Sequence, residues 1–400
     1  MESEAKRPVY LLPVIVFSQF AGTSLWFAGN AVLPELQAAL QLPESALGNI
    51  TSAVQFGFIT GTLTFAFLLI ADRFSPSKVF LVSAILGALC NLLIAFFLDG
   101  FGLLLLFRFM TGFFLAGIYP IGMKISADWY AKDLGKALGY LVGALVLGKA
   151  FPFFLKSQAN DLSWTFIIMA TSAVAVLGGL LIYFLVGDGP YRSQGNQFRP
   201  AVIGSMFQFP KFRAAAFGYF GHMWELYTFW AFTPLILETF NQLHPTVNLS
   251  ISFWSFVVIM LGTLGCIAGG YLSQRIGSAK VAFGMLLTSG LCCLFSPTLF
   301  LLPPTLLLVF LLIWGFSVVG DSPQFSTLVA QTAPKAYVGS ALTIVNCIGF
   351  SITIGSIELL NHLRQVMDER FIYLVLLAGP IFGLFSIRRL LWPRRVIGDG

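Results

Sequence analysis

The sequence has 400 residues, of which 57% are hydrophobic and 10% are charged, and its formal net charge is +6. Soluble domains carry about 25% charged residues, so this composition excludes a soluble globular protein. A membrane-spanning helix needs about 20 apolar residues, and a chain of this length has room for about a dozen of them. We therefore expect an all-α polytopic membrane protein embedded in the lipid bilayer.

Apolar runs bounded by charged or turn-forming residues predict twelve membrane-spanning helices. The first six are expected at residues 10–32, 46–71, 78–98, 102–125, 134–156 and 163–186. The other six are expected at residues 213–238, 250–274, 279–301, 304–326, 336–360 and 370–392. We therefore predict a first bundle over 1–187, a hydrophilic cytoplasmic linker over 188–212 and a second bundle over 213–400.

Most of the 23 Lys and Arg residues fall in loops on one side of the predicted membrane. The positive-inside rule then places both termini and the linker in the cytoplasm. We expect a bacterial inner or plasma membrane as the location. The cations are spread over short loops and form no cluster, which argues against binding to nucleic acid. We expect a monomer.

The two predicted bundles repeat one sequence pattern. Matching positions pair Arg73 with Arg275, Cys90 with Cys292, Gly112 with Gly315, Gly117 with Gly320 and Pro120 with Pro323. Because an even number of helices separates the copies, both have the same orientation in the membrane and are related by an axis along the membrane normal. Two such halves can rock about a site between them.

Several motifs in this repeat resemble those of the major facilitator superfamily of secondary transporters, and the resemblance covers the whole chain. Asp72 and Arg73 match the family's loop motif GxxxDRxGRR, with Lys78 close by, and Arg275 lies in the corresponding loop of the second half. Arg108 and Gly112 match its RxxxG motif. The resemblance implies a twelve-helix fold in two pseudo-symmetric halves, alternating access, and a gating role for the four loop residues Asp72, Arg73, Lys78 and Arg275.

The fifth predicted helix departs from the pattern of drug-exporting proton antiporters of that family. Those proteins end a series of glycines in GlyPro, whereas Gly148 is followed here by Lys149 and only later by Pro152. The chain also has only three His residues and lacks GxSxG, HExxH and a phosphate-binding glycine loop. The sequence therefore favours neither drug efflux nor an enzyme, and it predicts no cofactor and no metal site.

Ionisable side chains within the predicted spans are the candidates for function. Even the membrane-insertion scale with the lowest energies assigns a cost of about 2.5 kcal/mol to a charged side chain at the membrane centre. Arg108 and Lys149 are expected to bind an anionic substrate. Lys149 has a second interpretation, in which it neutralises a carboxylate of a neighbouring helix or extends to the outer surface. Interhelical salt bridges remain an alternative for Arg108 as well.

The seventh predicted helix carries His222 and Glu225, whose spacing places them next to each other on one helix face. Together with Asp321 of the tenth helix they are candidates for proton coupling, and a purely structural polar pair is the alternative. Trp26 and Asn30 of the first helix and Tyr227 of the seventh are candidates for substrate contacts, although packing also explains a Trp there.

These residues together predict a secondary active transporter. We expect proton-coupled uptake of a small organic or amphipathic anion by alternating access, with protons or another ion as the coupling partner. One alternative is proton-driven efflux of a hydrophobic compound or drug. An alternative of another class is a non-transporting membrane sensor or assembly partner, for which the linker over 188–212 is short.

Overall fold

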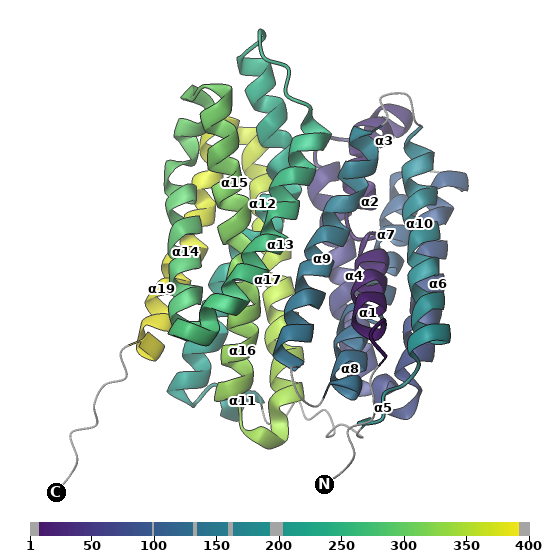
Figure 1. Cartoon of the computed structure of the whole chain (residues 1–400). Coiled ribbons are helices and arrows are strands. Elements are labelled where there is room, and N and C mark those ends of the chain that lie inside the picture. Colours follow the sequence, from purple (N-terminus) through teal and green to yellow (C-terminus); the bar gives the residue numbers. More distant parts are fainter. Residues whose placement is uncertain (1–7, 98–99, 131–133, 159–162, 193–202, 392–400) are drawn as a thin grey trace, which may run out of the picture.

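The computed structural model describes residues 8–97, 100–130, 134–158, 163–192 and 203–391, and these residues contain helices and no strand (Figure 1). The first half contains α1 (Leu11–Thr23), α2 (Ala28–Ala31), α3 (Leu33–Leu40), α4 (Ala46–Phe67), α5 (Ile70–Arg73), α6 (Pro76–Phe96), α7 (Phe101–Leu115), α8 (Tyr119–Trp129), α9 (Leu134–Ser157), α10 (Trp164–Leu181) and the π-helix η1 (Ile182–Val186). After α11 (Ile203–Met206), the second half contains α12 (Pro210–Leu243), α13 (Ile251–Ile276), α14 (Ser278–Phe295), η3 (Ser296–Leu301), α15 (Pro304–Gly320), α16 (Ser322–Thr332), η4 (Lys335–Tyr337), α17 (Val338–Val366), α18 (Glu369–Ile372), η5 (Tyr373–Leu377) and α19 (Ala378–Leu391).

Ten helical segments of the described chain are long and apolar enough to cross a membrane. The two other predicted spans correspond to α1 with α2, which is interrupted, and to α12, which carries more polar residues. The predicted all-α membrane fold is therefore confirmed, with a helical counterpart for each of the twelve spans.

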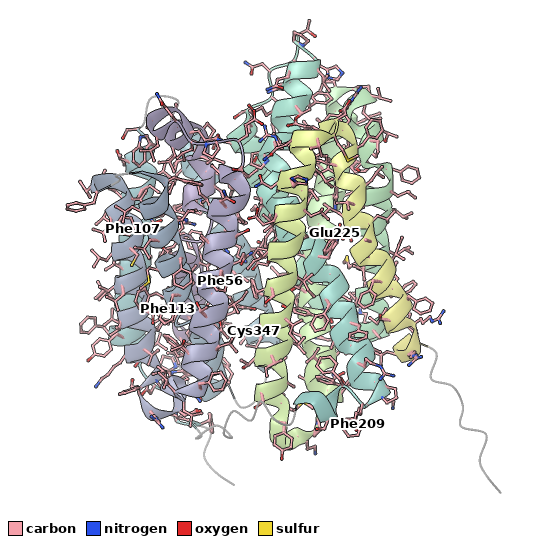
Figure 2. The ribbon with its side chains drawn as sticks, turned by 180° about the vertical axis from the view of Figure 1, so that it is seen from behind. Phe56, Phe107, Phe113, Phe209, Glu225 and Cys347 are labelled. Atoms are coloured by element: carbon pink, nitrogen blue, oxygen red, sulfur yellow. The ribbon has the colours of Figure 1, made fainter. Side chains whose placement is uncertain are left out.

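The helices form two adjoining bundles, one from each half of the sequence (Figure 1). The bundles meet along two pairs of helices, α4 against α17 and α9 against α13. Figure 2 shows the first pair from behind, with Phe56 of α4 and Cys347 of α17 on the adjoining helices. We refer to the end of the molecule that carries α3 in Figure 1 as the upper side and to the end that carries α5 and α11 as the lower side.

Matching glycines bring matching helices together in the two halves. A Cβ atom at Gly112 of α7 would lie 2.1 Å from the carbonyl oxygen of Val54 in α4, and one at Gly315 of α15 would lie 2.2 Å from that of Val258 in α13. Only a residue without a side chain permits this approach, as is common where membrane helices pack closely. The contact pattern thus repeats where the sequence repeats.

Several spans expected to be continuous helices are interrupted, and three of these interruptions bear on the site. The helix predicted over 10–32 ends at Thr23 and resumes at Ala28, the fourth span is interrupted between Leu115 and Tyr119, and the tenth at Asp321. Proline accounts for the last interruption, because Pro323 has no N–H to donate to the Val319 carbonyl. That carbonyl instead accepts a hydrogen bond from the Cys266 thiol at 3.3 Å, as the absence of water in the bilayer demands.

Candidate functional site

Arg108 lies fully buried against the interruption between α1 and α2. Its Nη1 donates to the Leu25 carbonyl at 3.2 Å and to Asn91 Oδ1 at 3.1 Å, and its Nη2 donates to the Trp26 carbonyl. The guanidinium thus supplies donors to carbonyls that lack helical partners. The structure places Arg108 as a support for this turn and shows it in no interhelical salt bridge within the described residues, and its predicted contact with substrate stays a prediction.

Lys149 of α9 lies fully buried between the two bundles. Its ammonium group donates to the hydroxyl of Tyr227 in α12, and its Nζ lies 4.0 Å from the ring centre of Trp26, 4.1 Å from that of Tyr227 and 5.0 Å from that of Trp230. Trp26, Tyr227 and Trp230 therefore form an aromatic cage for one cation.

The structure shows neither of the alternative roles predicted for Lys149, which were pairing with a neighbouring carboxylate and extension to the outer surface. Within the described residues no carboxylate oxygen lies within ion-pair distance of its Nζ, and its full burial is not compatible with an extended path to the outer surface. Sequence reasoning selected Lys149, Trp26 and Tyr227 but missed Trp230. Its position three residues after Tyr227, on the same helix face, was the available signal.

Further aromatic rings extend the cage across the interface between the bundles. The Phe58 ring of α4 lies 4.9 Å from that of Trp26 and 4.6 Å from that of Phe350 in α17. The Phe350 ring in turn lies 5.1 Å from Tyr227. This cluster closes the centre of the molecule with side chains from both halves.

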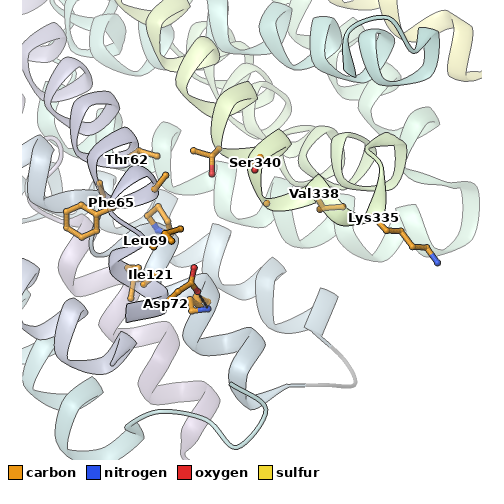
Figure 3. Close-up of a pocket in the computed structure, with 15 residues that line it drawn as sticks. Thr62, Phe65, Leu69, Asp72, Ile121, Lys335, Val338 and Ser340 are labelled. Atoms are coloured by element: carbon orange, nitrogen blue, oxygen red, sulfur yellow. Dashed lines mark hydrogen bonds and ion pairs between the residues drawn. The ribbon is translucent and has the colours of Figure 1, made fainter. Parts of the chain in front are cut away.

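A cavity of about 430 Å³ opens on the lower side, between the same two bundles. Figure 3 shows Thr62, Phe65 and Asp72 of the first half on one side of it and Val338 and Ser340 of α17 on the other. Thr62 lies one helical turn below Phe58 on α4, or about 6 Å along the helix axis. The aromatic cluster therefore lies above the inner end of the cavity.

The upper side is joined across the same interface by polar contacts, which we call the upper latch. Ser52 of α4 donates to Glu358 of α17 at 2.6 Å, and Asn361 Nδ2 donates to the Ser45 carbonyl at 3.1 Å. Sequence reasoning did not select Glu358, because its position near the outer surface favours an ordinary water-contacting residue over a coupling site. The bundles are thus in polar contact at one end and separated by a cavity at the other.

Asn30 of α2 lies near this central region and is almost fully buried. Its Nδ2 donates to Thr51 Oγ1 of α4 at 2.7 Å, while its Oδ1 has no hydrogen-bond partner within the described residues. Asn30 therefore connects α2 to α4, and its predicted contact with substrate stays a prediction.

Glu225 is buried within the second bundle, away from the interface with α4 (Figure 2). Its carboxylate accepts hydrogen bonds from Trp314 Nε1 at 2.6 Å, from Ser289 Oγ at 2.9 Å and from Cys293 Sγ at 3.3 Å. All three donors are neutral groups of α14 and α15. The carboxyl group is therefore well hydrogen-bonded without a cation.

The pairing predicted between His222 and Glu225 is wrong. His222 Nδ1 instead lies 2.8 Å from Asp321 Oδ1, at the interruption between α15 and α16, and both side chains are buried. The three-residue spacing within α12 directs these two side chains to different neighbouring helices. Nε2 of His222 and Oδ2 of Asp321 have no hydrogen-bond partner within the described part of the chain.

Of the four predicted gating residues, Asp72 forms an ion pair that the structure describes. Its Oδ1 lies 3.0 Å from Lys124 Nζ of α8, and its carbonyl accepts a hydrogen bond from Arg192 at 3.3 Å. The other three, which are Arg73, Lys78 and Arg275, are exposed at the lower side. The described ion pair of Asp72 lies within the first bundle.

The start of the linker packs against this same loop. The carboxylate of Asp188 accepts hydrogen bonds from the Ser77 N–H at 3.0 Å, Ser75 Oγ at 2.9 Å and Ser77 Oγ at 2.8 Å, and it pairs with Arg192 at 3.2 Å. Partial burial by itself would raise the pKa of Asp188, but these donors outweigh burial and hold the pKa below its ordinary value. Sequence reasoning missed this attachment.

The family model described as "Major Facilitator Superfamily" matches residues 15–356 of this sequence. The chain belongs to this superfamily. Its arrangement is similar to that of the proton:xylose symporter XylE bound to 6-bromo-6-deoxy-D-glucose, with a TM-score of 0.73, 12% identity, and coverage of 95% of this chain and 94% of that one. Members named among its relatives are transporters and not enzymes.

Two curated members of the superfamily are similar in sequence. The probable galactarate/D-glucarate transporter GudP of Bacillus subtilis (strain 168) is 32% identical over 140 residues, which are 32% of this chain and 30% of that protein. The probable sulfoacetate transporter SauU of Cupriavidus necator is 23% identical over 286 residues, which are 66% of this chain and 65% of that protein. The matched regions thus span less than two thirds of either relative.

Proposed function

We propose that the protein is a secondary active transporter that takes up a small organic anion together with protons. The observation that carries this proposal is Lys149, a buried cation between the two bundles whose described partners are neutral. Burial of an unpaired ammonium group is costly, and an anionic substrate offsets that cost. The relatives named as carriers of galactarate or D-glucarate and of sulfoacetate, which are organic anions, support the same class of substrate.

Alternating access fits the asymmetry between the two ends of the molecule. The lower cavity gives a path from one side toward the aromatic cluster, while the upper latch joins α4 to α17 at the other end. With the lower side in the cytoplasm, as the positive-inside rule predicts, this conformation faces inward. We place both termini and the linker 188–212 on that side, between a first bundle over 1–187 and a second over 213–400, in the inner membrane of a bacterium as a monomer.

Proton coupling is assigned to the buried acids of the second bundle. Glu225 and the His222–Asp321 pair lie on or next to α12, the helix that also supplies Tyr227 to the lysine cage. A change of protonation there can therefore reach the cage through one rigid helix. Transport that stays pH-dependent after Glu225→Gln would remove Glu225 from this role and leave the His222–Asp321 pair.

Asp72, Arg73, Lys78 and Arg275 are assigned to gating at the lower side. In the outward-facing state this side must close, and the four charges can then pair across the closing interface or with helix ends. Asp72→Ala should then slow turnover more than it weakens substrate binding. An unchanged turnover rate would argue against the gate.

The direct test is uptake by the purified protein in liposomes across an imposed proton gradient, with anionic, neutral and cationic solutes. We expect anions to accumulate when the proton gradient is directed inward. Lys149→Ala should reduce anion uptake about 100-fold or more, the usual result of removing one partner of a buried charge pair, and Lys149→Arg should retain part of it. A response to cations alone would overturn the proposal.

A further inference from the structure

The buried cations of the described chain are few. Among the Lys and Arg residues whose burial the structure describes, only Arg108 and Lys149 are fully buried. The two terminal nitrogens of Arg108 donate to the carbonyls of Leu25 and Trp26 and to Asn91. Arg108 is therefore engaged within the first bundle, and Lys149 is the fully buried cation at the interface between the bundles among those whose burial the structure describes.

The lysine cage also contains donors that lack acceptors. The indole Nε1 atoms of Trp26 and Trp230 are buried and have no hydrogen-bond partner within the described residues. An unpaired buried donor costs about 1–3 kcal/mol. Both indoles belong to rings within 5.0 Å of Lys149 Nζ. One ammonium group and two indole N–H groups are the complement of a single carboxylate, whose two oxygens accept several hydrogen bonds.

Aromatic rings make up much of the surroundings of this cage. Phe58, Phe350 and the ring of Tyr227 lie next to Trp26, with ring centres 4.6–5.8 Å apart. A second carboxylate placed among these rings would be an unpaired charge in an apolar environment, which is strongly unfavourable. A hydrocarbon or aromatic body would instead bury apolar surface there.

We propose that the cage of Lys149, Trp26, Tyr227 and Trp230 selects an organic monocarboxylate with an apolar or aromatic body and discriminates against dianions. This inference rests on the proposed function and narrows its substrate class. It also separates this chain from the relative named for galactarate and D-glucarate, which carry two carboxylates and several hydroxyl groups. The ammonium group and the indoles bind the carboxylate, and the Phe rings contact the body.

Binding to the full-length purified protein tests this selection, with intrinsic tryptophan fluorescence as the readout because two cage residues are Trp. Four probes isolate charge from shape. They are 3-phenylpropanoate as the monoanion, phenylsuccinate as the dianion with the same ring, 3-phenylpropanamide as the neutral analogue and glucarate as the polar dianion. We expect 3-phenylpropanoate to bind about tenfold or more tightly than the other three, a difference of about 1.4 kcal/mol or more.

Variants then assign the effect to the cage. Lys149→Met removes the charge and fills the space with an apolar chain, and it should abolish the preference for 3-phenylpropanoate over 3-phenylpropanamide. Lys149→Arg should retain that preference. This result would show that the loss in Lys149→Met comes from the missing charge and not from misfolding. Lys156→Gln is the matched control on the same helix, since Lys156 pairs with Glu35 in the first bundle, and it should leave all four affinities unchanged.

The outcomes separate the two proposals. If phenylsuccinate or glucarate binds as tightly as 3-phenylpropanoate, and Lys149→Met removes that binding, the monoanion preference is wrong while the organic-anion transporter stands. If none of the three anions binds but the amide does, the proposed function itself fails. A preference for 3-phenylpropanoate that persists in Lys149→Met would overturn the role of the cage.

Discussion

The fourth span contacts the first span of its own bundle in both halves of the molecule, but with opposite chemistry. In the first half, Arg108 of α7 donates to two carbonyls where the first span is interrupted. In the second half, Trp314 of α15 donates to the carboxylate of Glu225 on α12, which is continuous from Pro210 to Leu243. Aligned on Gly112 and Gly315, the position of Arg108 corresponds to an apolar residue, Leu311.

This difference explains where the buried charge of each half lies. A broken helix exposes carbonyl oxygens, so the first half needs a cationic donor at its centre. Around Glu225 the continuous helix α12 exposes none, and the second half can place an acid there that neutral donors satisfy. At the centre of each bundle, the same fold thus yields a basic residue in the first half and an acidic one in the second, with Lys149 at the boundary between them.

The largest expected loss of stability comes from replacing Arg108 with leucine, the residue at the matching position of the second half. Arg108→Leu leaves the carbonyls of Leu25 and Trp26 and the amide oxygen of Asn91 without their donor. With each orphaned buried acceptor costing about 1–3 kcal/mol, we expect a loss of about 3 kcal/mol or more. Thermal unfolding of the purified protein measures this loss. The control is Arg370→Leu at an exposed position. Equal stability of the two variants would contradict the role of Arg108 as a support for the turn between α1 and α2.

A smaller loss of stability is expected when the hydrogen bond between Trp314 and Glu225 in the second half is removed. Trp314→Phe removes the indole donor to Glu225 and keeps an aromatic ring near Phe229, whose centre lies 4.5 Å from that of Trp314. Ser289 and Cys293 still donate to the carboxylate, so the loss should be about 1.5–3 kcal/mol. The double variant with Glu225→Gln should lose less than the sum of the single variants. Additive losses would show that the two side chains do not interact.

Sequence reasoning recovered the features that depend on composition and periodicity. The spans, the repeat and the buried ionisable residues all follow from local patterns, because lipid solvation demands long apolar helices and makes each charge conspicuous. The family resemblance added the gating loop. The match of Gly112 with Gly315 belongs to that repeat, and the structure shows the same helix contact at both positions.

The partners of those residues were not predictable in the same way. His222 pairs with Asp321 and Glu225 with Trp314 because each contacts a different neighbouring helix. Spacing along α12 indicates which residues share a face but not which helix lies opposite. The interruption after Thr23 was missed for a related reason, since a side chain of α7, distant in the sequence, satisfies its carbonyls.

The repeated glycine contact gives a comparison in which the halves should behave alike. Gly112→Ala and Gly315→Ala each place a methyl group against a backbone oxygen, at 2.1 Å and 2.2 Å respectively. Overpacking of this kind costs about 1–3 kcal/mol, and we expect similar losses in thermal unfolding for the two variants. Gly139→Ala is the control, because nothing lies within 4 Å of its added Cβ. A marked difference between the two variants would mean that the copies do not share this packing.

The smallest effect, a change in the rate of proteolysis, is expected in the loops at the lower side, where the two halves also differ. The first-half loop is tied to the linker through Asp188 and Arg192, whereas Gln274 stands in the second half where Asp72 stands in the first. Asp188→Asn should weaken this attachment and raise the rate of tryptic cleavage within the linker about two- to threefold, as expected for a partly exposed ion pair. Asp368→Asn, on the upper side, is the matched control.

The pH dependence of this attachment follows from the sign of the pKa shift. Because the pKa of Asp188 is lower in the folded protein than its ordinary value, the carboxylate stabilises the fold at neutral pH, and that contribution is lost only as the pH falls through the lowered value. An ordinary Asp titrates near about 3.9. The cleavage rate, corrected for protease activity, should therefore stay constant from about pH 8 to pH 6 in the wild type. A rise within that range, or no change in Asp188→Asn, would show that another group holds the linker in place.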